Sequence, residues 1–91
     1  MNLTRHAQKR MQQRGINLQA IDYVLAYGRE IHDHQGGCII WLDKRCRQKI
    51  GHAEGDKVIR SLHKHLNAYV VVDSNGWIIT VGHRYKRVVR H

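Results

Sequence analysis

A β-hairpin pattern near the C-terminus places the strongest constraint on the fold. Ala68–Val72 and Trp77–Val81 are rich in β-branched and aromatic residues, and the polar segment Asp73-Ser74-Asn75-Gly76 separates them. Within this segment Asn75-Gly76 supplies the positive φ values that a tight hairpin turn needs. The sequence therefore predicts two antiparallel strands, and we expect the second to end where Gly82 follows it.

Two helices are predicted near the N-terminus. Thr4 is a suitable N-cap for the first helix, which ends at Arg14-Gly15 with a basic side chain and then a glycine. Asn17 caps the second helix, and Gly28 ends it. The apolar residues expected to face the core are Leu3, Ala7 and Met11 in the first helix, and Leu18, Ile21, Val24 and Leu25 in the second.

In the middle of the chain the sequence predicts a second hairpin, followed by two more helical segments. A short strand is expected to turn through a glycine pair into an apolar strand, and two helical segments follow, with a break marked by glycines. These segments are the strands Glu30–His34 and Cys38–Leu42 with the turn Gln35-Gly36-Gly37, and the helices Asp43–Ile50 and Asp56–Leu66 with Gly51 and Gly55 between them.

This order of elements defines the fold class. Early helices followed mainly by antiparallel strands indicate an α+β domain, with two N-terminal helices packed on one face of a small antiparallel sheet. The helical segments in the middle are additional to that arrangement. At 91 residues the chain forms one domain, over residues 1–91.

The charge of the chain indicates its partner. Sixteen Lys and Arg against seven Asp and Glu give a net charge of +9, and eight histidines add to it as the pH falls. The charge is clustered, because Met1–Arg14 and His83–His91 each contain four Lys or Arg residues and no acidic residue. Such an excess favours nucleic acid as the partner, ahead of an anionic membrane.

Other patterns exclude several classes of protein. Cys38 and Cys46 form neither a disulfide scaffold nor a Cys-x-x-Cys pair. No signal-peptide core or membrane-length apolar run is present, so we expect a cytoplasmic protein without a membrane partner. No glycine-rich phosphate loop, serine elbow or zinc-protease helix is present, so no cofactor is expected.

Metal binding is also not expected. His32-Asp33-His34 places two imidazoles on one face of a strand, but no cysteine or carboxylate is spaced in sequence to complete a zinc site. The scarcity of acidic residues argues against a two-metal nuclease.

The segment after Gly82 carries the candidate catalytic residues His83, Arg84 and Tyr85. An imidazole can act as acid or base near neutral pH, and a guanidinium can hold phosphate oxygens with two hydrogen bonds. The tyrosine can stack on a base or donate a proton. If the strand continues past Gly82, His83 and Tyr85 share one face and Arg84 lies on the other, whereas a bulge would change this arrangement.

The candidate nucleic-acid-binding residues lie on two segments. One is a face of the first helix, where basic side chains recur every four residues, and the other is the C-terminal tail. The residues are His6, Arg10 and Arg14 in the helix, and Lys86 and Arg87 in the tail.

Both ends of the chain resemble the domain-of-unknown-function 4258 family. Leu3–Ile16 has the signature of that family: the step His6-Ala7, an arginine four residues after the histidine, and Arg-Gly-Ile before a second helix. Ile78–Arg84 resembles its final strand. The segment Asp43–Leu66 differs, because it is longer and more helical than the hairpin usual in the family.

That family is similar in layout to the RelE/ParE-like toxin superfamily, whose members have paired helices against an antiparallel sheet. Many RelE-like members cut messenger RNA without a metal, using basic residues and late His, Arg or Tyr side chains. The resemblance implies a corresponding place for His83, Arg84 and Tyr85. ParE-like members act on gyrase instead, so the superfamily does not fix the activity.

The leading hypothesis is a small RelE-like domain that binds RNA and is a candidate metal-independent endoribonuclease. His83 would be the general acid or base, Arg84 with Arg10 would hold phosphate, and Glu30 is a candidate for a further base. One alternative is a nucleic-acid or ribosome-binding module without catalysis. Another is a toxin–antitoxin-type interaction domain whose basic groove an acidic antitoxin-like protein covers.

Overall fold

Four antiparallel strands with the two N-terminal helices packed on one of their faces make up the centre of the fold. The computed structural model describes residues 2–84 of the chain. None of the helices within these residues is long and apolar enough to cross a membrane. The elements are α1 (Arg5–Arg14), α2 (Leu18–Tyr27), β1 (Arg29–His32), β2 (Cys38–Trp41), α3 (Lys44–Glu54), α4 (Asp56–Ser61), the 3₁₀ helix η1 (His63–His65), β3 (Ala68–Val72) and β4 (Ile78–His83).

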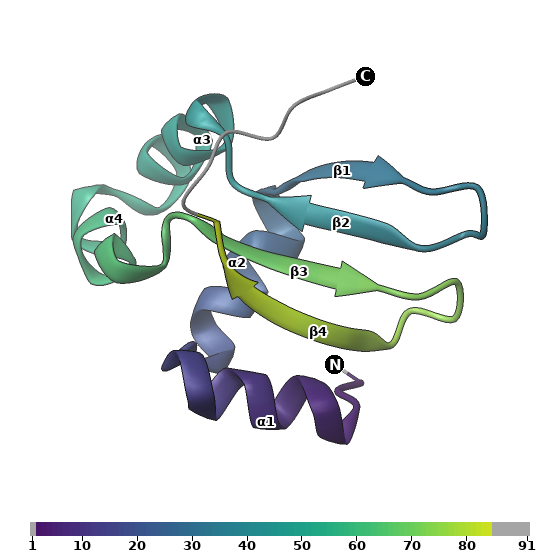
Figure 1. Ribbon diagram of the computed structural model, residues 1–91. Helices are drawn as coiled ribbons and strands as arrows, with labels where there is room; N and C mark the ends of the chain where they lie inside the picture. Colours follow the sequence, from purple (N-terminus) through teal and green to yellow (C-terminus); the bar gives the residue numbers. More distant parts are fainter. Residues whose placement is uncertain (1, 85–91) are drawn as a thin grey trace.

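The sheet is a meander in the order β1-β2-β3-β4. α1 packs along β4, and α2 packs on β2 and β3 from the same side (Figure 1). The register places Ile40, Val70 and Val81 side by side on three neighbouring strands, and all three are buried against the helices. This row is the centre of the core, and the predicted α+β class with two N-terminal helices on an antiparallel sheet is confirmed.

The predicted caps Thr4 and Asn17 are confirmed by their hydrogen bonds, and Asp43 caps α3 in the same way. Thr4, Asn17 and Asp43 each accept a hydrogen bond from the backbone N–H three residues later, which satisfies a donor that the helix itself leaves unpaired. The cap at Asp43 also lowers the pKa of its carboxyl to about 2, mainly because the carboxylate accepts from Cys46 N–H. Gly15 ends α1 at a φ of 65°, as predicted for a C-terminal glycine.

In each of the two hairpin loops an aspartate side chain accepts hydrogen bonds from the loop backbone. Asp33 accepts from the N–H groups of Gln35 and Gly37, and Asp73 accepts from those of Asn75 and Trp77. Only glycines have positive φ among the described residues, so Asn75 does not adopt the conformation expected of it. The turn after β3 is a three-residue loop that ends in a glycine with positive φ. The Asp73 side chain holds the backbone of this loop in place.

Several predicted boundaries were wrong. β1 begins at Arg29 and ends at His32, and β2 ends at Trp41, one residue before the predicted Leu42. β4 begins at Ile78 and continues through Gly82 to His83, so Gly82 does not end it. Leu18 was expected in the core but is 51% exposed, because it is the first residue of α2 and lies beside α1 at the surface.

The middle helices also differ from the prediction. α3 continues through Gly51 to Glu54, and the break comes at Gly55, whose φ of 88° the other residue types rarely adopt. The predicted helix Asp56–Leu66 ends early at Ser61 and gives way to η1, with Leu62 buried between them. As a result, His65 lies at the end of η1, shortly before the start of β3.

We predict that Gly28→Ala destabilises the fold strongly. A Cβ at Gly28 would lie 2.2 Å from the Val24 carbonyl oxygen and 2.5 Å from Ile40 Cγ2, and the first of these atoms is backbone. Overpacking of this kind costs roughly 1–3 kcal/mol or more in the free energy of unfolding, which urea denaturation measures. Gly51→Ala is the control: its Cβ would lie 3.8 Å from Ile59, and alanine should stabilise α3 by up to about 1 kcal/mol. Equal effects of the two substitutions would contradict the packing at Gly28.

Candidate functional site

Hydrogen bonds at the N-terminus set the position of α1 along β4. Ile78 N–H donates to Asn2 O at 2.8 Å and Thr4 N–H donates to Ile78 O at 3.0 Å, so α1 starts beside the start of β4. Both elements then run in the same direction (Figure 1). The nine steps from Arg5 to Arg14 at about 1.5 Å each span about 14 Å, and the five steps from Ile78 to His83 at about 3.3 Å each span about 16 Å. Arg14 at the end of α1 therefore comes level with His83 at the end of β4.

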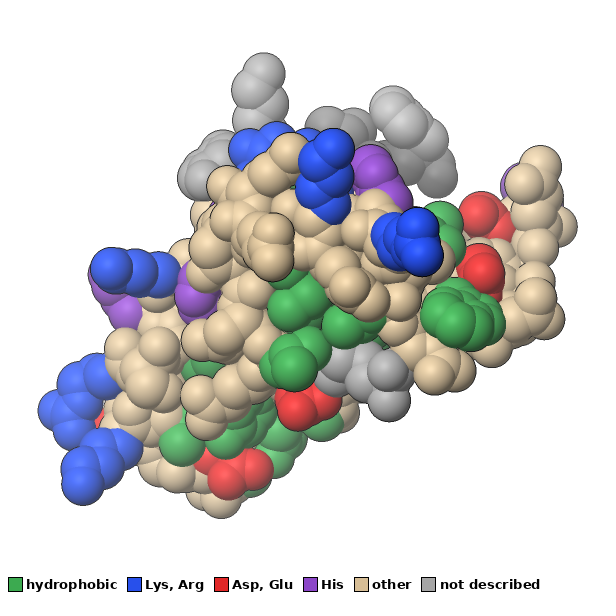
Figure 2. Space-filling model, turned by 90° about the horizontal axis from the view of Figure 1, so that it is seen from below, with side chains coloured by type: hydrophobic (Ala, Val, Ile, Leu, Met, Phe, Trp, Pro, Cys, Tyr) green, Lys and Arg blue, Asp and Glu red, His purple; other side chains and the backbone are tan. Residues whose placement is uncertain are grey.

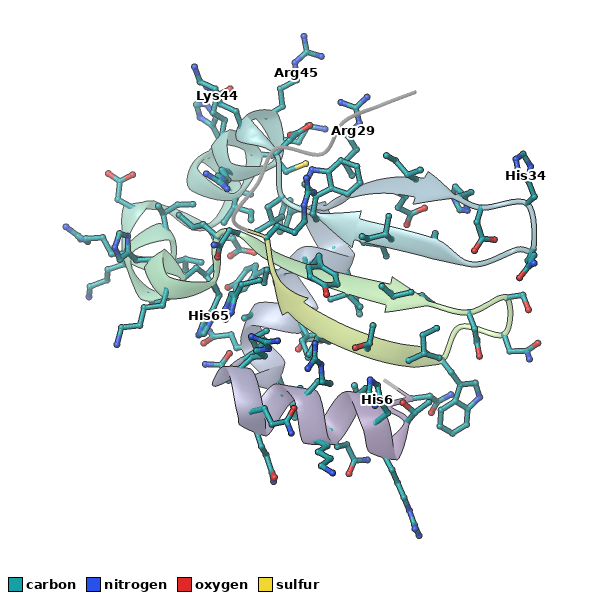
Figure 3. The ribbon with its side chains drawn as sticks, in the orientation of Figure 1. His6, Arg29, His34, Lys44, Arg45 and His65 are labelled. Carbon is teal, nitrogen blue, oxygen red and sulfur yellow. The ribbon has the colours of Figure 1, made fainter. Side chains whose placement is uncertain are left out.

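His83 forms a pair with His65. The two rings stack at 5.6 Å between centroids with 11° between their planes, and His65 Nδ1 lies 3.4 Å from His83 Nε2. The strand register explains the pairing, because Ala68 lies opposite His83 and η1 comes just before β3. The side chain of His65 lies where η1 faces the C-terminal end of α1 (Figure 3). Both histidines are half-buried.

The pKa of each histidine lies below its ordinary value of 6.5. For His83 burial is the main cause, followed by the nearby positive charges of His65 and Arg14. For His65 burial again comes first, followed by Lys64. The two rings are therefore neutral at pH 7 and able to accept a proton. Since the folded state disfavours their charged form, the fold loses stability as the pH falls from about 6.5 towards the lowered pKa values, and above about pH 6.5 the two rings carry no such penalty.

Two arginines of α1 lie on the helix face that leads to this end of the molecule. Arg10 lies one helical turn before Arg14 on the same face, and its Nε is buried without a hydrogen-bond partner. The ion pairs among residues 2–84 are Arg29–Asp43 and His32–Glu30, so neither arginine meets a carboxylate there. We call Arg10, Arg14, His65 and His83 the cationic corner. The positive charges of its two arginines suit an anion.

Arg84 lies on the other face of the sheet. Arg84 N–H donates to Asn67 O at 2.7 Å, which continues the strand pairing, so side chains still alternate. Its guanidinium lies 4.6 Å from the centre of the Trp41 ring, a cation–π contact that helps bury Trp41 to 8% exposure. The prediction that Arg84 and Arg10 hold one phosphate was wrong, because the sheet separates the two side chains.

Arg84 nevertheless offers hydrogen-bond donors on that face. Its Nη1 is buried without a hydrogen-bond partner, and burial lowers the pKa of the guanidinium. The open face therefore carries a cation and an aromatic ring in contact, apart from the cationic corner.

The other predicted residues do not join the corner. His6 is exposed near the first turn of α1, at the opposite end of the helix from His65 (Figure 3). Glu30 lies in β1, three strand spacings of about 4.8 Å from β4. It forms a hydrogen bond with His32 instead. Tyr85, Lys86 and Arg87 lie outside the described residues.

His65 is the site residue that the sequence analysis missed. The predicted helix Asp56–Leu66 contained it without assigning it a role. In an antiparallel hairpin, however, residues before the first strand meet residues after the second. Counting back from Ala68 would have indicated that His65 and His83 lie at the same end of the sheet.

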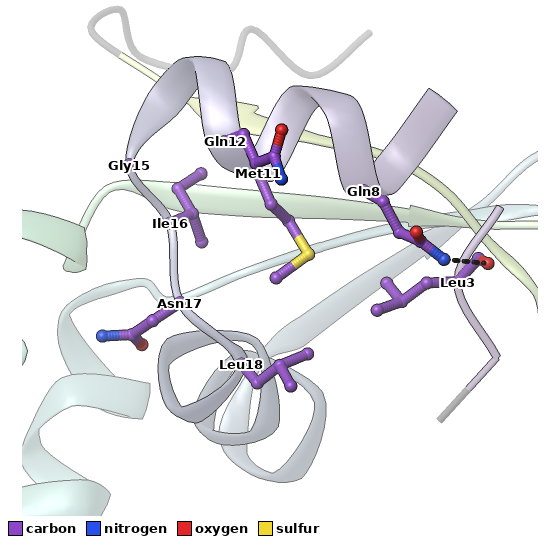
Figure 4. Close-up of a pocket in the computed structure, with 8 residues that line it drawn as sticks. All are labelled: Leu3, Gln8, Met11, Gln12, Gly15, Ile16, Asn17 and Leu18. Atoms are coloured by element: carbon purple, nitrogen blue, oxygen red, sulfur yellow. Dashed lines mark hydrogen bonds between the residues drawn. The ribbon is translucent and has the colours of Figure 1, made fainter. Parts of the chain in front are cut away.

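An apolar groove lies between α1 and the start of α2. It measures about 480 Å³, and Gln8 donates to the Leu3 carbonyl at its edge (Figure 4). From this side hydrophobic side chains show in the middle of the surface, with Lys, Arg and His side chains toward its margins (Figure 2). None of the residues that line the groove has a titratable side chain, so the groove offers no acid or base. Its lining residues are Leu3, Gln8, Met11, Gln12, Gly15, Ile16, Asn17 and Leu18.

These observations define a small α+β domain with a cationic, histidine-containing corner. Residues 3–83 match the family described as domain of unknown function (DUF4258), so the chain belongs to that family. No curated protein and no solved structure matches the chain.

We predict that the two histidines titrate as a coupled pair. In an NMR titration the His83 imidazole should reach half-protonation below pH 6.5. In His65→Gln and in Arg14→Gln the midpoint should move upward, because each change removes positive charge near the ring. Lys9→Gln, an exposed position on α1, should leave it unchanged. A wild-type midpoint at or above 6.5 would be inconsistent with this arrangement.

Proposed function

We propose that the protein binds RNA through the cationic corner. The observation that carries the proposal is the stacked pair of His65 and His83 with the positive charge of Arg14 acting on it, and with no carboxylate paired to Arg10 or Arg14 within residues 2–84. The net charge of +9 supports a polyanion as the ligand, because long-range attraction adds to the local contacts. A phosphodiester at the corner would balance the positive charges of Arg10 and Arg14.

We further propose that the corner cleaves RNA without a metal ion. The histidine pair is neutral at pH 7 and accepts the proton of a ribose 2′-hydroxyl, so that the 2′-oxygen forms a bond to phosphorus. Arg14 stabilises the negative charge that develops on the phosphate. The bond to the 5′-oxygen then breaks, and the proton returns from the pair to that oxygen.

The fold supports a RelE/ParE-like assignment as part of this proposal. The order of two N-terminal helices followed by an antiparallel meander fits that superfamily, and the cationic site lies at the end of the last strand. The assignment favours RNA over other polyanions, but the proposal itself depends on the geometry of the corner.

RNA binding is predicted to weaken when Arg14 is replaced. With labelled single-stranded RNA in fluorescence anisotropy, Arg14→Gln should lower affinity about tenfold. It should also reduce the slope of log K against log salt concentration by about 0.7, the value for one lost phosphate contact. Arg5→Gln is the same substitution on the same helix, at an exposed position away from the corner, and should change affinity less. Equal losses in the two variants would mean that only net charge matters.

Cleavage is predicted to proceed in EDTA and to give 2′,3′-cyclic phosphate ends. His65→Gln and His83→Gln should each lower the rate by about 10²–10⁴, the usual range for a lost acid–base group, and lower affinity far less. His34→Gln, in the exposed loop after β1, should cut as fast as wild type. If wild-type protein binds RNA but leaves it intact, the cleavage proposal is wrong and the protein is a non-enzymatic RNA-binding module.

A further inference from the structure

A second cluster of chemically active side chains lies at the other edge of the sheet. In the β1–β2 hairpin His32 lies opposite Cys38, and Glu30 precedes His32 by two residues and so shares its face. A carboxylate oxygen of Glu30, a ring nitrogen of His32 and Cys38 Sγ all lie within 4.8 Å of one another. Sequence spacing did not indicate this cluster, because strand pairing brings together residues that are not spaced as metal ligands along the chain.

We propose that Glu30, His32 and Cys38 bind Zn²⁺. Zinc takes thiolate, imidazole and carboxylate ligands in tetrahedral geometry at about 2.0–2.3 Å, which separates neighbouring donor atoms by roughly 3.3–3.7 Å. His32 Nε2 and Glu30 Oε2 already lie 3.1 Å apart, so small side-chain rotations would bring all three donors to these separations. This site is independent of the proposed RNA chemistry.

The ligand types select zinc over harder cations. Magnesium and calcium prefer oxygen ligands throughout, whereas one thiolate and one imidazole favour zinc. Cys38 is a free, half-buried thiol on a strand, so it is held in place without being closed off. His32 and Glu30 side chains are 65% and 48% exposed, which leaves the metal accessible and a fourth position open to water or another ligand.

Proton release should accompany binding. The pKa of the Cys38 thiol is raised, first by burial and then by the negative charges of Glu30 and Asp33. Without metal the sulfur is therefore protonated at neutral pH, and zinc must displace that proton. The affinity for zinc should therefore rise with pH, because the thiol loses its proton more easily at higher pH. The negative charges of Glu30 and Asp33 also attract the cation.

The test uses the full chain, reduced and stripped of metal, titrated with Zn²⁺ by calorimetry and with Co²⁺ by absorption spectroscopy. Wild type should bind one equivalent of zinc, and Co²⁺ should give a thiolate-to-metal charge-transfer band. Cys38→Ser should abolish the band, and His32→Gln and Glu30→Gln should each lower zinc affinity at least about tenfold, the loss that even an outer-shell partner costs. His34→Gln, a neighbouring exposed histidine, should leave both signals intact.

Two outcomes would overturn the site. One is a band that survives Cys38→Ser, which would have to come from the buried Cys46. The other is a loss in His34→Gln equal to that in His32→Gln, which would mean adventitious binding to surface histidines. Circular dichroism checks that Cys38→Ser folds, and if it does not, the two exposed variants His32→Gln and Glu30→Gln decide the question alone. RNA binding should be unchanged in all of these variants, so this test and that of the proposed function fail separately.

Discussion

The backbone hydrogen bonds between Asn2–Thr4 and the start of β4 determine where the cationic corner forms. They join residues more than seventy positions apart and align the start of a helix with the start of a strand. From that point the helix needs twice as many residues as the strand to cover the same length. Arg14 and His83 come close because the ten residues of α1 and the six residues of β4 end at about the same level. A shift of one helical turn would place a different side chain opposite His83.

Continuation of β4 through Gly82 decides which side chains can act together. A Cβ at Gly82 would lie 2.8 Å from atoms of the Tyr69 ring, so the absence of a side chain lets Tyr69 lie over the strand and keeps the pairing regular. Regular pairing sends His83 to the helix-covered face and Arg84 to the open face, where it contacts Trp41. The three adjacent residues His83, Arg84 and Tyr85 look like one constellation in the sequence, but the pleat of the strand separates the first two.

Local signals in the sequence predicted the elements well, and pairing between elements accounts for what they missed. The caps at Thr4 and Asn17 and the stripe of Ala7 and Met11 depend on neighbours within one helix, so they could be read directly. The partners of His83 and Cys38 depend on strand register, which spacing along the chain does not reveal. Gly51 misled the prediction for a related reason: it does not have a positive φ and the helix continues through it, whereas the break comes at Gly55, whose φ is 88°.

The charges of the neighbouring residues determine whether a histidine site favours an anion or a metal cation, and the two histidine sites of this protein differ in these charges. The rings of His65 and His83 are neutral, and neutral imidazoles are metal ligands in general. Arg14 and Lys64, however, place positive charge beside them, which disfavours a bound cation and favours an anion. His32 has the opposite surroundings, with Glu30 bonded to it and the negative charge of Asp33 acting on the facing Cys38. The same side chain therefore suits a phosphate at one edge of the sheet and a metal ion at the other, and the charges of the surrounding residues make the difference.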